Sequence, residues 1–272
     1  MGQPARARIV DSHCHISSLW YEPIEPLLFQ MRRNGVDNAV LIQMFGQFDN
    51  REILEASQRY PGKFAPVVMV NAADPNATVD MQRLANAGAR GVRLEASTRS
   101  AGSDPLAIWW RADELGLSVS CNGSTIDYLT PHFRSVLDEL PALPIVIEHL
   151  GRDGGTPSGI EFEDTVFDEL LKLASCPNLF LRFHGLGELL PRGARFDGAS
   201  TPFIRAQRDR LVDAVSAFGP ERMMWGSDYP PVSGREGYRN ALDLPRNTLS
   251  FLGEEAIDLL FGGTASHFYH LS

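Results

Sequence analysis

The sequence predicts an α/β protein of the (β/α)8-barrel class, the TIM barrel, with a single domain over residues 1–272. Eight short apolar runs recur along the chain, and helix-like segments separate them. The runs are rich in Val, Ile and Leu without clean alternation, which is typical of strands buried on both faces. The length agrees, because such barrels often reach about 250 residues in one domain.

The predicted strands alternate with segments that carry helix start and stop signals. Residues 25–35 end in Gly35, a candidate C-cap, and residues 49–62 open with Asp49, a candidate N-cap. The segments 74–88 and 104–116 begin with Asp near Pro and close in Gly, and 208–222 follows the same logic. The eight apolar runs are 7–16, 38–45, 64–71, 89–96, 117–123, 143–151, 179–185 and 221–230.

The connections between these elements are of two kinds. Those before strands are short, whereas three that follow strands are long and rich in Gly and Pro: 150–159, 185–202 and 230–237. In a barrel, all loops after strands emerge on one face, and that face carries the chemistry. No Gly-x-Gly-x-x-Gly follows any strand, so the sequence does not indicate a dinucleotide site.

Composition excludes several classes of protein. The formal net charge is −9, without a basic block, which argues against nucleic acid as a partner. The three cysteines, Cys14, Cys121 and Cys176, form no C-x-x-C and favour a reducing compartment. No secretory signal is visible, and no apolar run approaches the roughly 18 residues of a membrane span. We therefore expect a cytoplasmic protein without a membrane partner.

Two histidines, His13 and His15, lie two residues apart on the first predicted strand. The two-residue period of a strand places both imidazoles on one face. If that face is the barrel interior, the pair could hold one divalent ion. Taken alone, the pair is equally compatible with ordinary polar roles, but most of the other predicted strands also end in polar or charged residues.

Three further polar residues end strands six, seven and eight. His149 ends the sixth strand, and Glu148 beside it should face the opposite way if the strand is regular. His184 ends the seventh strand and shares a face with Arg182. Asp228 follows the eighth strand and precedes Pro230, so it is a candidate general base or, alternatively, a turn cap.

An arginine on the fourth predicted strand has two interpretations. Arg93 could bind a substrate carboxylate through its guanidinium, with Arg99 reaching the same mouth from the following loop. Alternatively, Arg93 pairs with Glu95, which lies on the same face of the strand. The first interpretation predicts a small anionic substrate.

These residues resemble the amidohydrolase-related branch of the amidohydrolase superfamily. The matching motifs are Asp-Ser-His-Cys-His at 11–15, Gly-Val-Arg at 91–93, Ile-Glu-His-Leu-Gly at 147–151 and Trp-Gly-Ser-Asp-Tyr-Pro at 225–230. The stretch 261–265 is similar to the family's closing helix. Within the branch, the chain looks most like the sugar-lactone and 2-pyrone-4,6-dicarboxylate lactonases, and Arg93 and Arg99 are spaced like a pair of carboxylate-binding arginines there.

The resemblance also bears on metal content. Binuclear members carry a lysine on strand four, and this strand has Arg93 and no lysine. The metal-dependent decarboxylases add a histidine from strand five, and residues 117–123 contain none. The resemblance therefore implies at most one ion, zinc first, held by His13, His15 and Asp228 with His184 or water. Some lactonases of the branch work without metal, so the requirement stays open.

The sequence thus predicts a hydrolase that opens a lactone or similar cyclic ester. Asp228 would deprotonate the attacking water, and His149, with His13 and His15 or their metal, would polarise the carbonyl. Arg93, Arg99 and His184 would contact the substrate. The alternatives are a metal-dependent decarboxylase of an aromatic or enoic acid, a hydrolase of C–N or C–C bonds, and a non-catalytic binding barrel. Whether the chain forms a homo-oligomer stays open.

Overall fold

Eight parallel strands form the centre of the computed structural model, which describes residues 6–151, 164–189 and 205–271. The strands neighbour one another in chain order, from β1 to β8, and each lies within one of the eight predicted runs. They are β1 (Val10–Cys14), β2 (Asn38–Ile42), β3 (Phe64–Val68), β4 (Gly91–Glu95), β5 (Ser118–Asn122), β6 (Ile145–Ile147), β7 (Leu179–Phe183) and β8 (Met223–Trp225). The predicted (β/α)8 barrel is confirmed.

The segment that follows β8 closes the barrel against β1. The backbone N–H of Asp228 donates to the carbonyl of His13 at 2.9 Å, and the N–H of His15 donates to the carbonyl of Tyr229 at 2.8 Å. A parallel bridge between Cys14 and Tyr229 lies at the same place. The seam that closes the barrel therefore runs directly between the two motifs that carry His13 and Asp228.

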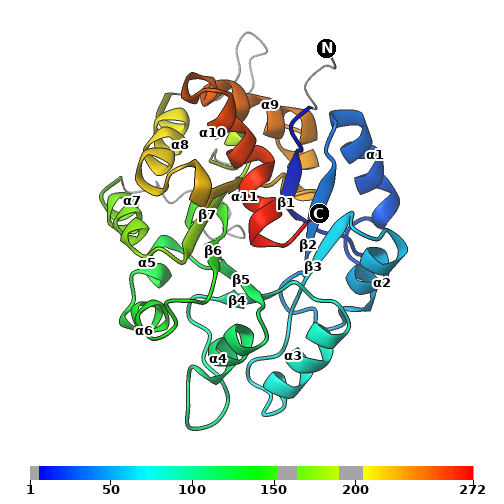
Figure 1. The fold of residues 1–272 in the computed structure, drawn as a ribbon, viewed down its shortest axis with the longest axis vertical. Coiled ribbons are helices and arrows are strands. Elements are labelled where there is room, and N and C mark those ends of the chain that lie inside the picture. Colours follow the sequence, from blue (N-terminus) through cyan, green and yellow to red (C-terminus); the bar gives the residue numbers. More distant parts are fainter. Residues whose placement is uncertain (1–5, 152–163, 190–204, 272) are drawn as a thin grey trace.

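Helices surround the strands on the outside of the ring (Figure 1). The predicted C-cap at Gly35 is confirmed: the residue has φ 70°, and its N–H donates to the carbonyl of Met31. The helices are α1 (Ile24–Asn34), α2 (Arg51–Arg59), α3 (Ala77–Asn86), α4 (Ala107–Glu114), α5 (Thr125–Tyr128), α6 (Pro131–Glu139), α7 (Asp164–Leu171), α8 (Arg205–Phe218), α9 (Tyr238–Thr248), α10 (Glu254–Asp258) and α11 (Thr264–Phe268).

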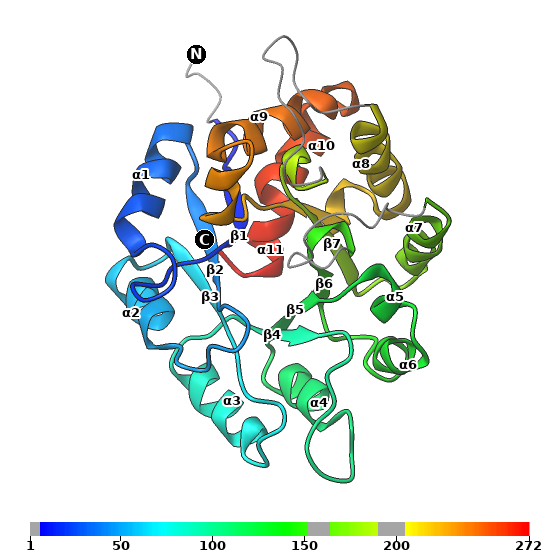
Figure 2. The same cartoon turned by 180° about the vertical axis from the view of Figure 1, so that it is seen from behind.

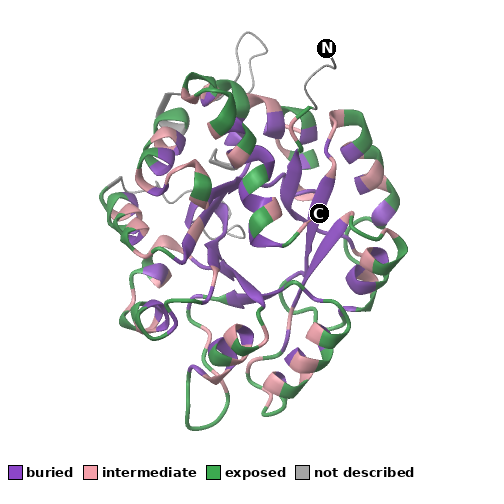
Figure 3. Ribbon diagram, in the orientation of Figure 1, coloured by how far each residue is buried: buried purple, intermediate pink, exposed green. Residues whose placement is uncertain are grey.

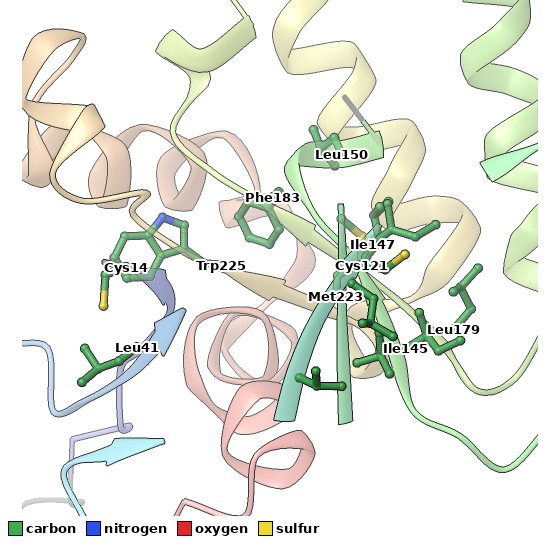
Figure 4. Packing of buried hydrophobic residues seen from close by; sticks show 14 of the residues in the cluster. Cys14, Leu41, Cys121, Ile145, Ile147, Leu150, Leu179, Phe183, Met223 and Trp225 are labelled. Atoms are coloured by element: carbon green, nitrogen blue, oxygen red, sulfur yellow. The ribbon is translucent and has the colours of Figure 1, made fainter. Parts of the chain in front are cut away.

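The larger part of the core lies between the strands and the surrounding helices. In Figure 3 the strands are buried almost throughout, whereas the helices are buried only along their inner faces. Outward-facing side chains fill this layer, among them Leu41, Phe183 and Trp225 (Figure 4). The indole N–H of Trp225 donates to the carbonyl of Ala241 at 2.8 Å, so its one polar group is satisfied in the core.

A second, smaller cluster fills the barrel interior and includes the C-terminal helix. Inward-facing residues of the strands, such as Val40 and Met224, pack with Ala265, Phe268 and Tyr269 of the α11 region. Helix α11 lies across the centre of the ring in both views (Figures 1 and 2). It fills one part of the interior, while the polar residues at the carboxyl ends of the strands line another.

Two of the three long loops predicted after strands fall mainly on residues 152–163 and 190–204, which lie outside the described residues. The third, 230–237, is described and forms a 3-10 turn at Pro231–Gly234 before α9. Among the described residues, no helix is both long and apolar enough to cross a lipid bilayer.

Candidate active site

His13 and His15 both face the barrel interior at the end of β1. Their Nε2 atoms lie 3.1 Å apart, and their rings meet edge to face with centroids 4.8 Å apart. His13 is fully buried and His15 nearly so. Burial lowers the pKa of His13 well below its ordinary value, and His15 and His184 nearby lower it further. The prediction that these two histidines share one face is confirmed.

Asp228 joins the two histidines from the segment after β8. Its Oδ1 lies 3.8 Å from Nε2 of His13 and 3.6 Å from Nε2 of His15. The residue has φ 55°, a left-handed conformation that aspartate tolerates better than most residues. Gly226, two residues earlier, packs on His13, and a Cβ built there would come within 2.6 Å of the His13 Cβ. The glycine of this motif is therefore required for β8 to approach β1.

His149 and His184 complete the cluster from β6 and β7. The His149 ring lies 5.0 Å from that of His13 and 4.3 Å from that of His184. The His184 ring lies 4.8 Å from that of His13, and its Nδ1–H donates to the carbonyl of Gly226 at 2.9 Å. Four histidines and one aspartate, all predicted from strand ends, thus converge on one place.

The expectation that Glu148 faces away from His149 is wrong. β6 ends at Ile147, and both His149 and Leu150 take left-handed conformations, with φ 55° and 53°. This break in the strand period lets the side chains of both Glu148 and His149 face the interior, where Oε2 of Glu148 lies 3.8 Å from Nε2 of His149. Glu148 is fully buried.

Arg93 is paired with Glu148 and not with Glu95. Its Nε and Nη2 donate to the two oxygens of Glu148 at 3.1 and 2.6 Å, and its Nη1 donates to the carbonyl of Gln43 at 3.0 Å. The guanidinium also lies over the ring of Phe45, 4.1 Å from the centroid. Glu95 is exposed at the end of β4. The predicted pairing of Arg93 with Glu95 is therefore wrong, although Arg93 does have a buried ionic partner, which is Glu148.

The charges around Glu148 determine its protonation. Burial alone would raise the pKa of Glu148, but the positive charges of Arg93 and Arg182, together with His149, hold this pKa at about 2. Arg182 lies 3.7 Å away on β7 and is itself fully buried. Beneath the histidines, the barrel therefore contains an ionised carboxylate between two guanidinium groups.

Arg99 is placed apart from these residues. It is exposed and lines a groove between the loop before α4 and helix α6, with Asp104, His132 and Glu139. The Nε2–H of His132 donates to the carbonyl of Thr98 at 2.8 Å. No contact between Arg99 and the histidine cluster occurs in the described part of the chain.

Sequence reasoning missed Arg235, which reaches the site from the loop after β8. Its Nη1 lies 3.0 Å from Oδ2 of Asp228, and its Nε lies 3.6 Å from the carboxylate of Glu236. Its position in the long loop after β8 could have indicated it, because such loops supply the site residues of a barrel. Tyr21, from the loop after β1, was also missed, and its ring lies 5.8 Å from that of His15.

The cluster offers two sets of donor atoms for a metal ion. The sets are His13 with His15 and Asp228, and His13 with His149 and His184; within each set the donor atoms lie within 4.8 Å of one another. These positions suit a small divalent ion. The hydrogen bonding of His13, however, does not suit metal binding, because Nη1 of Arg182 donates to its Nδ1 at 3.0 Å. His13 therefore lacks the acceptor on Nδ1 that a metal-bound histidine normally has.

Comparison with known proteins agrees with the fold and with the family that the sequence resembles. The sequence model of the amidohydrolase family matches residues 10–271. An L-fucono-1,5-lactonase from Burkholderia ambifaria is 27% identical over 260 residues, which cover 92% of this chain and 84% of that protein.

Solved structures show the same fold at lower identity. A Pseudomonas putida structure assigned as a 2-pyrone-4,6-dicarboxylic acid hydrolase superposes with a TM-score of 0.73 at 24% identity, over 98% of this chain and 99% of that one. An amidohydrolase from Burkholderia multivorans with bound zinc gives a TM-score of 0.80 at 21% identity, over 98% and 100% of the two chains.

Proposed function

The chain belongs to the amidohydrolase family, and from this premise we propose that it hydrolyses the lactone ring of a small organic acid. The observation that carries the proposal is the convergence of Asp228 with His13, His15, His149 and His184 at the strand ends. A carboxylate beside several imidazoles supplies both a base for water and hydrogen-bond donors for a carbonyl oxygen. The fuconolactonase relative supports the substrate class.

In the proposed reaction, Asp228 accepts a proton from a water molecule as that water attacks the lactone carbonyl carbon. The carbonyl oxygen becomes an oxyanion, which the N–H groups of His149 and His13 stabilise. The bond between the carbonyl carbon and the ring oxygen then breaks, and the ring oxygen takes the proton that Asp228 accepted from the water. The product is an open-chain hydroxy acid, and near neutral pH each turnover releases one proton to the solution.

A carboxylated substrate remains part of the proposal, but we assign its recognition differently from the sequence. Arg93 is 5% exposed and its donors point to Glu148 and Gln43, so we propose that it supports the site from below. Arg99 shares its groove with two acidic residues. Arg235 contacts Asp228 directly, so a substrate carboxylate near the reacting water would meet Arg235 first.

The sequence left open whether the enzyme uses one zinc ion, with His13, His15 and Asp228 as its ligands, or works without metal. Bound there, the ion would act as a Lewis acid on the carbonyl. We derive no step through it, because the hydrogen bond from Arg182 opposes metal ligation by His13. The lack of a histidine on β5 counts against the decarboxylase alternative.

A panel of lactones assayed by proton release tests the proposed function. The panel should contain sugar lactones, lactones that carry a second carboxylate and neutral aliphatic lactones. We expect hydrolysis of at least one of the first two classes, with the same rate after treatment with a chelator. Release of CO2 from aromatic acids, without hydrolysis of any lactone, would contradict the proposed lactonase and favour the decarboxylase alternative.

A further inference from the structure

Arg182 is held rigidly beneath the histidine cluster. It extends from β7 into the barrel interior, is fully buried, and every one of its three nitrogens donates a hydrogen bond. Nε donates to Oγ of Ser12 at 3.1 Å, and Nη2 donates to the hydroxyl of Tyr269 at 2.5 Å. Nη1 donates both to Oγ of Ser120 at 2.8 Å and to Nδ1 of His13 at 3.0 Å.

The contact with Arg182 determines which nitrogen of His13 carries the proton. A guanidinium is only a donor, so Nδ1 of His13 must accept the bond with its lone pair. A neutral imidazole whose Nδ1 is the acceptor carries its hydrogen on Nε2. His13 is therefore an N–H donor toward the site.

The neighbouring histidine has the opposite arrangement. Nδ1 of His15 lies 2.7 Å from the carbonyl of Ile42, which can only accept, so His15 carries its proton on Nδ1 and has a lone pair on Nε2. The 3.1 Å contact between the two Nε2 atoms is then a hydrogen bond from His13 to His15. The hydrogen bonds therefore all point in one direction, from Arg182 through His13 and His15 to the backbone of β2, and no two hydrogens are directed at each other.

We propose that Arg182 is a positioning residue that fixes His13 as a hydrogen-bond donor at Nε2 and thereby opposes its use as a metal ligand. A histidine that binds metal usually donates its second N–H to a carbonyl or a carboxylate. His15 and His184 do so, through Ile42 and Gly226, whereas His13 accepts from a cation. Both candidate metal sets include His13, so without it each keeps two ligands, fewer than the three protein ligands usual in catalytic zinc sites.

Arg182 cannot easily withdraw to release His13. Ser12, Ser120 and Tyr269 hold its other donors, and the carboxylate of Glu148 lies 3.7 Å from Nη1. In the proposed lactone hydrolysis, on which this part of the inference rests, an entering carbonyl oxygen would replace His15 as the acceptor of the His13 N–H. The donor is preorganised, so it needs no proton shift as the oxyanion forms.

Long-range ¹H–¹⁵N correlation of the full-length wild-type protein measures the proposal directly, independently of any lactone. A His13→Gln variant assigns the His13 signals. We expect wild-type His13 to carry its proton on Nε2 and His15 to carry its proton on Nδ1. A wild-type His13 protonated on Nδ1 would overturn the proposal, whether or not the protein hydrolyses lactones.

Zinc affinity, measured by calorimetry on chelator-treated protein, gives a second readout. Arg182→Met removes the donor to His13, and we expect zinc to bind about 10- to 100-fold more tightly than in wild type, as fits the loss of one charge-assisted hydrogen bond. Tyr269→Phe is the matched control, because it removes another partner of Arg182 and leaves His13 bonded. Equal zinc affinity in wild type and Arg182→Met would refute the inference, and if that variant does not fold, the wild-type spectrum decides.

Discussion

Asp228 divides its two oxygens between two kinds of partner. Oδ1 faces Nε2 of His13 and His15, and Oδ2 faces Nη1 of Arg235 at 3.0 Å. The carboxylate is thus held from both sides, with one oxygen directed at the imidazoles. A guanidinium at this distance can also serve an anionic group of the substrate.

Changing Arg235→Met should raise KM about tenfold or more for a carboxylated lactone, because one charge-assisted hydrogen bond is lost. KM for a neutral lactone should stay nearly the same, while kcat falls for both as Asp228 loses its support. Steady-state kinetics on the two substrates measure the split.

Arg99→Met is the matched control, since Arg99 is exposed in a groove outside the cluster. We expect wild-type kinetics from this variant. If only Arg99→Met raised KM for the acidic lactone, Arg99 would be the carboxylate-binding residue, as the sequence predicted. If Arg235→Met raised KM equally for both lactones, the role of Arg235 would be limited to holding Asp228.

Some residues of the site could be predicted from the sequence and others could not. His13, His15 and Asp228 follow apolar strands, and the two-residue period alone places the histidine pair on one face. Glu148 could not be placed, because the left-handed backbone at His149 interrupts that period. Arg235 depends on the path of a loop, which no periodic pattern encodes.

Among the elements, β4 and β6 are joined through the barrel interior by the pair of Arg93 and Glu148. These strands do not neighbour each other in the sheet, since β5 lies between them. The pair is nearly inaccessible to water, with side chains 6% and 0% exposed. Removing Arg93 breaks the two hydrogen bonds that it donates to Glu148 and leaves Arg182, 3.7 Å away, as the remaining guanidinium beside this buried carboxylate; breaking a buried ion pair is strongly destabilising.

Arg93→Met should therefore lower the free energy of unfolding by about 3–5 kcal/mol. Urea denaturation followed by circular dichroism measures this change. Arg83→Met, which breaks the exposed pair with Asp80 on α3, is the control and should change the free energy of unfolding by about 1 kcal/mol or less. The double variant Arg93→Met, Glu148→Leu should also be less stable than wild type, because it leaves the buried Arg182 without its carboxylate neighbour. An Arg93→Met variant as stable as wild type would show that the pair does not support the barrel.

The same pair predicts how stability depends on pH. The pKa of Glu148 is about 2 in the folded protein against an ordinary value of 4.5, so the folded state favours the ionised form. Its contribution is complete above pH 4.5 and is lost as pH falls from 4.5 toward 2, by about 3 kcal/mol in total. Burial raises the pKa of Asp11, which acts in the opposite direction.

Comparison with the double variant isolates the Glu148 contribution, because Asp11 is present in both proteins. The difference in unfolding free energy between wild type and the double variant should shrink steadily below pH 4.5. A difference that stays constant down to pH 3 would show that Glu148 titrates normally in the folded state.

At the scale of the whole molecule, the barrel was predictable because eight apolar runs alternate with helix signals, and all eight runs contain the observed strands. The packing of α11 was not predictable in the same way. It depends on Gly262, where a Cβ would come within 1.9 Å of the carbonyl oxygen of Arg8, a contact between distant parts of the chain. The single domain over 1–272, a cytoplasmic location and any homo-oligomer stay predictions.

We propose that Asp228, at the carboxyl end of the barrel, activates the water that opens a lactone. The most direct test is kcat of Asp228→Asn on the lactone that wild type hydrolyses best, measured by proton release. The variant keeps the shape of the side chain and removes the base, and circular dichroism should confirm an unchanged fold. We predict a fall in kcat of about 100-fold or more, whereas near wild-type turnover in a folded variant would contradict the claim.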